Sequence, residues 1–512
     1  MLIAMTGVSG SMGSEALAQV MKQEGVRTRV LLTPRKGNDK LEKELVKQYG
    51  ARIEILRGQV YDKKTCEKLV SGADMLVNMA AVIPPRSDKD PKASYLCNYK
   101  GAVCLADAAA NAAVQPKFIH ISTVAVYGNR TLEHPWGRPG DPLLPAVYDH
   151  YALHKMMAEW YVMERGLKNF AVLRQSAMLY EGIIFKNIHD GLLFHTTLNG
   201  PLEWVSARDS GYLIRRIAER ELAGGNETFW NGVYDIAGGP QNRCTGYDTF
   251  ADGFSLMGGS PKKYFKPCHC ETRNFHGLWF ADGALEEMFG YQRDTVKGFW
   301  EEIGKKYKFF KAAKLVPSAL IRLFLFRRLL GDGNAPAKWI KEGDEGRVIA
   351  AFGGMEEALS LPRDWEDFAV ADAAQWGGRE ARPLENCKDK LLSHGYDESK
   401  RPSEWTIEDM RAAAAFRGGA CLSEKMGATP YEKLQWSCSE GHVFSASPYT
   451  VLKGGHWCPA CLSEGWNFDA LAQKSPFYAQ VWYDSHARGE NMRYWFDEEG
   501  NARFEEVAKE RA

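Results

Sequence analysis

Tyr151 and Lys155 are the two residues of this sequence whose types and spacing most directly suggest chemistry. They open a stretch with a helical pattern, and residues four apart on a helix share one face. A free phenol has a pKa of about 10, but a nearby ammonium favours the phenolate and lowers that pKa. We therefore expect the pair to move a proton to or from a substrate hydroxyl. Because Tyr-x-x-x-Lys also occurs by chance on helix surfaces, this hypothesis needs a hydride carrier and a further hydrogen-bond donor.

A glycine-rich loop at the start of the chain predicts the hydride carrier. Residues 2–6 form a short apolar run, glycines follow at positions 7, 10 and 13, and a helical pattern begins directly afterwards. A strand, a glycine loop and a helix are the context of a dinucleotide site, in which the helix N-terminus faces the pyrophosphate. The loop residues expected to contact the cofactor are Gly7, Ser9, Gly10, Met12 and Gly13.

The end of the next predicted strand favours NADP over NAD. An NAD site normally has an acidic residue at this point to bind the ribose 2′-hydroxyl. This sequence instead has Arg35 and Lys36, which suit a 2′-phosphate. The alternative is an exposed basic turn, and NAD stays open.

Predicted strands and helices alternate along the first 310 residues, which predicts an α/β fold of the Rossmann type with a doubly wound parallel sheet. Ligands bind beyond the carboxyl ends of such strands. Ala80 and Ala81 follow one strand and are expected to lie against the cofactor. Thr123, or with less support Ser122, ends the next strand and is expected to hydrogen-bond a substrate oxygen together with Tyr151.

These motifs resemble, in order and spacing, the extended short-chain dehydrogenase/reductases, which form the NAD-dependent epimerase/dehydratase family. The resemblance covers about residues 1–300 and implies an NAD(P)-dependent enzyme. It implies that Tyr151 is the general acid or base, that Lys155 holds the phenolate and the nicotinamide ribose, and that Thr123 orients the carbonyl. Asn98 resembles the asparagine that the family carries on a helix beside the cofactor.

Three departures from the family pattern narrow the expected reaction. Gln59 stands where the family usually has an Asp near the adenine, which puts that contact in doubt. Val124 and Ala125 replace the acidic pair of the sugar dehydratases, so dehydration is not expected. His154 replaces a common Ser, and we expect it to point outward. Reversible alcohol–ketone chemistry remains, either with a free cofactor or in an epimerase that retains it.

The segment from Leu179 to Tyr212 is expected to meet the substrate because it is aromatic and carries few charges. A nucleotide sugar would need cationic side chains to bind its diphosphate, and the only obvious candidates are Lys186, Arg208 and Arg243. A lipid or steroid-like alcohol or ketone and a sugar nucleotide therefore both stay open. The aromatic residues would serve equally well as core.

Four residues near the C-terminus have the spacing of a structural zinc site. Cys438 and His442 form one knuckle, and Cys458 and Cys461 form another, so three thiolates and one imidazole would close a tetrahedral site. Cys421 is a reserve ligand. The pattern resembles small zinc ribbons appended to other bacterial domains, and a closed ligand set predicts a role in folding rather than catalysis.

Bulk composition limits the remaining possibilities. The 512 residues carry 65 Lys+Arg and 65 Asp+Glu, so the zero net charge gives no global electrostatic case for nucleic acid or an anionic membrane. We expect three parts, namely an NAD(P)-binding domain over 1–310, a helical connection over 311–417 and a zinc-ribbon-like domain over 418–512. No signal peptide is expected, and 11 scattered cysteines favour a reducing cytoplasm.

The candidate partners follow from the same survey. The leading candidate partner is an alcohol or ketone substrate, and a homodimer stays open. Residues 314–330 could dock on the first domain, which we prefer, or make weak contact with a membrane surface. An NADP-sensing scaffold acting through the zinc ribbon is the alternative from another class.

Overall fold

The computed structural model describes residues 1–183, 185, 189–376, 391–463, 465–497 and 502–506. At its centre is a seven-stranded parallel sheet with the order β10-β7-β5-β4-β1-β2-β3, the doubly wound arrangement predicted from the sequence. The strands are β1 (Leu2–Thr6), β2 (Arg27–Leu32), β3 (Ile53–Arg57), β4 (Met75–Asn78), β5 (Lys117–Thr123), β7 (Phe170–Gln175) and β10 (Gly232–Ile236). The central strands are almost wholly buried because both of their faces are covered by helices.

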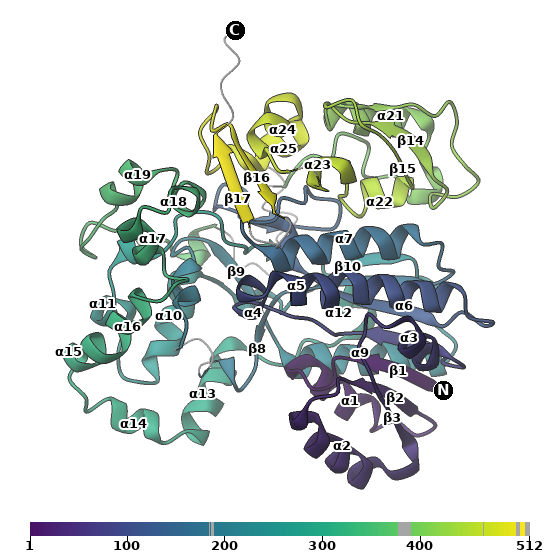
Figure 1. Ribbon diagram of the computed structural model, residues 1–512, viewed down its shortest axis with the longest axis horizontal. Helices are drawn as coiled ribbons and strands as arrows, with labels where there is room; N and C mark the ends of the chain where they lie inside the picture. The colour runs from purple at the N-terminus through teal and green to yellow at the C-terminus, as the bar shows by residue number, and fades with distance from the viewer. Residues whose placement is uncertain (184, 186–188, 377–390, 464, 498–501, 507–512) are drawn as a thin grey trace.

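Helices cover the two faces of the sheet (Figure 1). One face holds α1 (Ser11–Val20), α9 (Ala207–Leu222) and α12 (Ala284–Phe289), and the other holds α3 (Lys63–Val70), α6 (Gly101–Ala110) and α7 (His150–Glu164). The helix α2 (Lys36–Tyr49) lies at the β3 edge. In α9, Leu213, Ile214 and Ile217 share the buried face, the spacing of an amphipathic helix.

A second lobe lies beyond the carboxyl edge of the sheet (Figure 1). Its three-stranded sheet joins β8 (Ala177–Leu179), β9 (Pro201–Ser206) and β11 (Arg243–Thr245). Its helices include α10 (Gly246–Ser255), α11 (Pro261–Tyr264), α13 (Val296–Lys306), α14 (Phe309–Ala313), α15 (Ser318–Ile321) and α16 (Arg327–Leu330), with a π-helical stretch over Arg322–Phe326. Three further helices follow, α17 (Pro336–Glu342), α18 (Glu345–Phe352) and α19 (Met355–Ser360).

The C-terminal region packs on the far side of α7 (Figure 1). One hydrophobic core joins Val126 and Leu144 of the first part to Trp436 and Phe477 of the last. Its elements are α21 (Ile407–Phe416), β13 (Ala420–Cys421), β14 (Leu434–Ser437), β15 (Val443–Ala446), α22 (Pro448–Leu452), α23 (Pro459–Ser463), α24 (Phe468–Lys474), α25 (Pro476–Trp482), β16 (Met492–Phe496) and β17 (Ala502–Glu506). The domain boundaries at 310 and 417 stay a prediction.

Most of the predicted elements are present, with one clear error. The sequence patterns of residues 494–496 and 502–504 predict a terminal hairpin, which the antiparallel pair β16 and β17 confirms, and its expected turn at 498–501 lies outside the described residues. The pattern of residues 365–375 predicts a helix, and this prediction is wrong, since only Ala373–Trp376 forms a short 3₁₀ turn. The chain stays irregular there because the Trp365 indole donates to the Phe265 carbonyl and holds the segment against the second lobe. Among the described residues, no helix is long and apolar enough to cross a bilayer.

Candidate active site and metal centre

The glycine loop lies between β1 and α1 and packs closely on the end of β4. Gly7 has a φ of +72°, and a Cβ there would come within 2.5 Å of the Met79 carbonyl carbon. A Cβ on Gly13 would meet the Gly7 oxygen at 2.2 Å, so both positions require glycine. Gly10 begins α1 without a side-chain cap, which leaves the first-turn N–H groups free of a side-chain acceptor. These features fit the diphosphate of a dinucleotide.

Residues from the neighbouring strands complete this edge of the sheet. Thr6 accepts hydrogen bonds from the backbone of Met79 and Ala80, both at 3.1 Å, and so fixes the end of β4. Ala81 is exposed beside them. Asn98 is buried, and its amide bonds to both the N–H and the carbonyl of Val82, each at 2.8 Å. Asn98 therefore shapes the loop that follows β4.

The two cations of the NADP hypothesis lie at the start of α2. The Arg35 guanidinium donates to the Ser9 hydroxyl at 3.1 Å, which brings it to the rim of the glycine loop. Lys36 is the first residue of α2 and is exposed. Two cationic side chains thus follow β2 next to the glycine loop, where they could pair with a 2′-phosphate. Met12, on α1, is buried in the core beneath this loop.

Tyr151, Lys155 and Thr123 meet where α7 passes the end of β5. Asp149 caps α7 by accepting from the Ala152 N–H at 2.9 Å, which sets where the helix begins. The Tyr151 hydroxyl hydrogen-bonds with Thr123. The Lys155 ammonium donates to the Ile121 carbonyl at 2.7 Å, and burial lowers its pKa to about 8.

The expected lowering of the Tyr151 pKa is not found. Burial raises the pKa of this phenol, while its hydrogen bond with Thr123 opposes the rise. The Lys155 charge is directed at a backbone carbonyl instead. Tyr151 is therefore protonated at neutral pH, the form that can donate a proton to a carbonyl oxygen.

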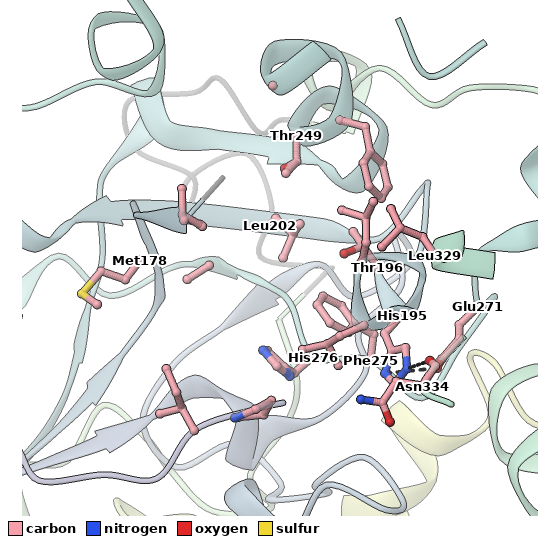
Figure 2. Close-up of a pocket in the computed structure, with 18 of the residues that line it drawn as sticks. Met178, His195, Thr196, Leu202, Thr249, Glu271, Phe275, His276, Leu329 and Asn334 are labelled. Carbon is pink, nitrogen blue, oxygen red and sulfur yellow. Dashed lines mark hydrogen bonds and ion pairs between the residues drawn. The ribbon is translucent and has the colours of Figure 1, made fainter. Parts of the chain in front are cut away.

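A cavity of about 620 Å³ opens in front of this group. Thr123 and Tyr151 are among the residues that line it, and the rest of the wall is mainly apolar. Figure 2 shows part of this lining, including Met178, Leu202 and Leu329. Phe185 and Phe309 line it and are exposed, so the cavity reaches the surface beside α14. Apolar lining residues include Met178, Leu202, Trp204, Phe254, Met257, Phe275, Leu325, Phe326 and Leu329.

Residues 3–176 match the model of the NAD dependent epimerase/dehydratase family. This part of the chain is similar to that family. The family model describes NAD-dependent epimerases and dehydratases, which are enzymes. The match ends one residue beyond β7, so the second lobe and the C-terminal region lie outside it.

Two of the solved structures to which the chain is similar are a dehydratase and an epimerase. The dTDP-glucose 4,6-dehydratase DesIV from Streptomyces venezuelae, with NAD and DAU bound, is 21% identical, with a TM-score of 0.48, over 61% of this chain and 100% of its own. UDP-glucuronic acid 4-epimerase from Bacillus cereus, in complex with UDP-glucuronic acid and NAD, is 17% identical, with a TM-score of 0.46, over 60% of this chain and 100% of its own.

The cavity holds polar groups that sequence reasoning missed. Figure 2 shows His195, Glu271, His276 and Asn334 grouped at one side of the cavity. Glu271 is 2% exposed, its carboxylate lies 3.4 Å from the His195 ring, and burial raises its pKa. These residues lie far apart in sequence and share no motif with Tyr151, so no sequence signal joined them.

Carboxyl groups also lie nearer to Tyr151 than the sequence suggested. Asp88 and Asp149 line the same cavity, and burial raises their pKa values to about 7 and about 6. Val124 and Ala125, which replace the acidic pair of the dehydratases, are buried. The cavity therefore contains acids even though none follows Thr123.

The cations suggested for a sugar diphosphate are engaged elsewhere. Arg208 pairs with Asp294 and Glu302, and Arg243 pairs with the buried Glu203. Neither lines the cavity among the described residues, and Lys186 lies outside them. Arg347 is the one lysine or arginine in the described lining.

One further expectation about the site differs from the structure. His154 is buried rather than outward, with its ring 3.0 Å from the Ser94 hydroxyl, because short helical turns over 86–100 cover that side of α7. Gln59 is half-buried, at the end of the β3 loop.

The four predicted metal ligands come together in the C-terminal region. The ligand atoms of Cys438, His442, Cys458 and Cys461 all lie within 4.8 Å of one another. The sulfurs of Cys438 and Cys461 are 3.7 Å apart, and His442 Nδ1 lies 3.4–3.6 Å from the three sulfurs. Tetrahedral zinc with Zn–S of ~2.3 Å and Zn–N of ~2.05 Å requires separations of about 3.8 and 3.6 Å. The donor set thus fits zinc, and Cys421 is not part of it.

The metal cluster lies next to the back of α7. Just before the second knuckle, His456 approaches Glu159 at 3.2 Å, and the Gly454 carbonyl accepts from Arg174 at 2.6 Å. Glu159 and Arg174 form a fully buried ion pair at 2.7 Å. Although burial alone would raise it, the Arg174 charge and the His456 contact hold the pKa of Glu159 far below its usual range. Ser447 also donates to Glu164 at the end of α7.

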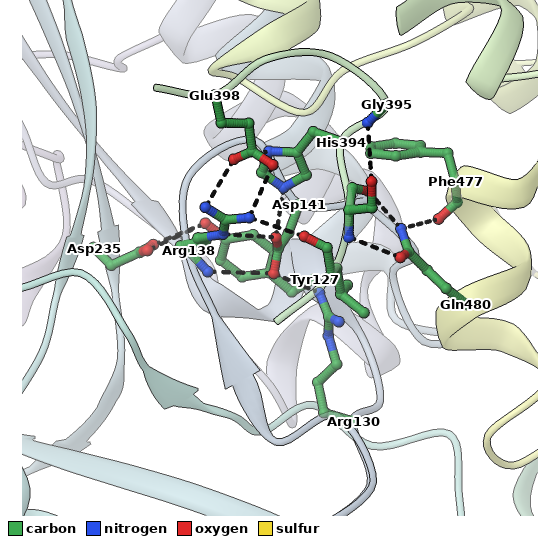
Figure 3. A network of polar contacts seen from close by, with 12 residues as sticks. Tyr127, Arg130, Arg138, Asp141, Asp235, His394, Gly395, Glu398, Phe477 and Gln480 are labelled. Carbon is green, nitrogen blue, oxygen red and sulfur yellow. Dashed lines mark hydrogen bonds and ion pairs between the residues drawn. The ribbon is translucent and has the colours of Figure 1, made fainter. Parts of the chain in front are cut away.

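A second buried polar network ties the C-terminal region to the loop before α7 (Figure 3). Asp141 lies 2.8 Å from the His394 ring and 3.1 Å from the Arg130 guanidinium. Arg138 pairs with Glu398 at 2.7 Å. Burial alone would raise the pKa of Glu398, but His394 and Arg138 together lower it to about 2.

Proposed function

We propose that this enzyme interconverts an apolar alcohol and the corresponding ketone, with NADP as the hydride carrier. The observation that carries the proposal is the mainly apolar cavity whose lining includes Thr123 and Tyr151. A lipid or steroid-like compound suits that wall. A nucleotide diphosphate would find one lysine or arginine, Arg347, in the described lining, so the cavity offers its phosphates little cationic pairing.

The glycine loop, Arg35 and Lys36 would hold the cofactor, with Ala80 and Ala81 against it and Asn98 shaping the adjoining loop. Bound nicotinamide supplies the hydride. Thr123 orients the substrate oxygen by a hydrogen bond, and Tyr151 donates its proton to that oxygen during reduction. The buried Lys155 ammonium donates to the Ile121 carbonyl and so holds the strand that ends at Thr123. Burial raises the pKa of Tyr151, so the phenol starts protonated, as a proton donor in the reduction must.

Dehydration by a retained-cofactor enzyme is the second candidate. Asp149 lies two residues before Tyr151, lines the cavity and has a pKa raised to about 6, so part of it is protonated near neutral pH. A protonated carboxyl group is the acid that the sequence lacked after Thr123. An epimerase with retained cofactor remains open in the same pocket. The zinc-binding thiols must be reduced to bind metal, which supports a cytoplasmic location.

The substrate class can be tested with one cavity variant. We expect NADPH-dependent reduction of a steroid-type ketone, and no turnover of a UDP- or dTDP-sugar. Leu325→Asp places a charge in the cavity wall and should raise KM for the ketone by about tenfold or more. The measurement is NADPH oxidation at varied ketone concentration, with NADPH affinity determined separately.

Leu222→Asp is the matched control, because Leu222 is an exposed leucine at the end of α9 and away from the cavity. It should leave kcat and KM unchanged. Turnover of the sugar nucleotides with no reduction of any apolar ketone would contradict the proposed substrate class.

A further inference from the structure

The segment over residues 303–331 differs in charge from the rest of the chain. The whole chain has zero formal net charge, but this segment holds eight lysines and arginines and no acidic residue. They are Lys305, Lys306, Lys308, Lys311, Lys314, Arg322, Arg327 and Arg328. Such a cationic cluster attracts an anionic surface over roughly a Debye length, ~8–10 Å at physiological salt.

The same segment presents apolar side chains on two opposite sides. Phe326 and Leu329 are buried in a cluster with Phe194 and Phe265 of the second lobe, so the predicted docking is real. Leu315, Leu320 and Phe324 instead remain 86%, 45% and 72% exposed. Figure 1 shows α14, α15 and α16 along the outer border of the second lobe, on the opposite side of the molecule from α3 and α6. Large apolar side chains gathered on a basic border mark a contact surface.

A basic recess adjoins this surface. It has a volume of about 680 Å³ and is formed by α11, α16, α17 and the segment near Trp365. Eight cationic side chains line it against two acidic ones, Glu342 and Asp364. The cations are Lys262, Lys263, Lys266, Arg322, Arg327, Lys338, Lys341 and Arg363. A recess of this charge suits phosphate groups.

We propose that the segment from α14 to α16 docks on an anionic phospholipid membrane. Leu315, Leu320 and Phe324 enter the boundary between headgroups and acyl chains, and the surrounding cations and the basic recess contact the lipid phosphates. Exposed apolar residues combined with lysine and arginine are the pattern of interfacial segments, and each cation near an anionic leaflet contributes about 1 kcal/mol. A second copy of the chain is the weaker fit, because a symmetric contact would bring like charges together.

The docking surface and the substrate cavity share their elements. Phe310 and Ala313 of α14, and Leu325 and Leu329 near α16, line the cavity. Phe309 lies at its rim and is 54% exposed. A membrane bound at this surface would therefore face the mouth of the cavity, and an apolar substrate could pass between them without crossing water. This last step rests on the proposed function, whereas the docking does not.

Vesicle binding of the full-length enzyme tests the docking without any turnover. We expect it to cosediment with phosphatidylcholine vesicles containing phosphatidylglycerol at low salt, to bind pure phosphatidylcholine at least tenfold more weakly, and to leave the anionic vesicles at high salt. The double variant Leu320→Glu, Phe324→Glu should weaken partitioning by about tenfold or more. Neither residue lines the cavity, so NADPH affinity should stay unchanged.

Matched control variants test whether vesicle binding depends on this surface or on nonspecific adsorption of the protein. Val114→Glu alters an exposed apolar residue near the opposite edge of the molecule and should leave vesicle binding intact. Arg327→Glu, Arg328→Glu should weaken binding, whereas Lys43→Glu, Lys47→Glu on α2 should not. The proposal is overturned if the wild-type enzyme stays in solution with anionic vesicles at low salt, or if Val114→Glu is as damaging as the double variant. A dimer that Phe324→Glu dissociates, with no vesicle binding, would also overturn it.

Discussion

The front and the back of α7 are both buried, but they face different surroundings. The front carries Tyr151 and Lys155 beside a cavity that reaches solvent. The back carries Glu159, which is fully buried against Arg174 and His456. A reacting side chain needs a space in front of it, whereas a buried charge needs complete pairing. One helix thus meets both requirements, and the C-terminal region supplies the partners on the back.

The largest effect on the front should come from Tyr151→Phe. Removing the proton donor should lower kcat by about 10³-fold, within the range typical of general acids. NADPH affinity should stay nearly unchanged, because the hydroxyl faces the substrate cavity. Steady-state kinetics and a fluorescence titration of NADPH check the two parts. Turnover retained by the Tyr151→Phe variant would contradict the assignment of Tyr151 as the proton donor.

The back should respond in stability rather than in chemistry. Glu159→Ala leaves Arg174 and His456 without their buried carboxylate and should lower the free energy of unfolding by about 3–5 kcal/mol. The measurement is urea denaturation. Glu67→Ala removes the exposed partner of Lys63 and should cost less than about 1 kcal/mol. Equal stabilities for the Glu159 variant and the wild type would remove the contrast between the two faces.

The four predicted metal ligands, which lie next to the back of α7, extend the same comparison. Cys458→Ser should abolish stoichiometric zinc and destabilise the C-terminal region by ~3 kcal/mol or more, because the metal contributes directly to folding. Cys421→Ser is the matched control, since this thiol lies outside the cluster, and it should retain zinc. Elemental analysis and thermal unfolding are the measurements. Wild-type enzyme purified without chelator and free of zinc would refute the assignment.

A smaller effect is expected at the cofactor end of the front. Arg35→Ala should weaken NADPH binding by about tenfold and leave NADH unchanged, because the guanidinium would contact only the 2′-phosphate. Lys40→Ala, one turn further along α2, is the control. Parallel titrations with the two dinucleotides decide the point. Equal loss for NADPH and NADH would show that Arg35 acts on the loop through Ser9 rather than on the phosphate.

The sequence predicted the front of α7 well, because its parts are local motifs. The glycine loop, the strand ends and the Tyr151–Lys155 spacing each follow from residues close together in the chain. The back could not be predicted in this way. Glu159, Arg174 and His456 belong to three distant segments, and nothing in their local spacing announces a shared buried network. The metal ligands lie between these extremes, since two short knuckles suffice to predict them.

The polar side of the cavity was missed for the same reason. Glu271 and His276 come from an irregular segment whose pattern predicts no element, and His195 ends the short 3₁₀ helix Gly191–His195. The lowered Tyr151 pKa was also wrong, because helical spacing gives a shared face but not the direction of the lysine side chain. Burial of the phenol, to which the second lobe contributes, raises its pKa and outweighs any lowering by the lysine charge.

Hydride transfer with labelled cofactor tests the central claim most directly. The enzyme would be supplied with NADPH deuterated at the transferable position and an apolar steroid-type ketone, and the product would be analysed by mass spectrometry. The account predicts an alcohol with one deuterium on the carbinol carbon, formed by the wild type and lost with Tyr151→Phe. Bound NADPH with no labelled alcohol from any ketone tested, or labelled product formed equally well by Tyr151→Phe, would contradict it.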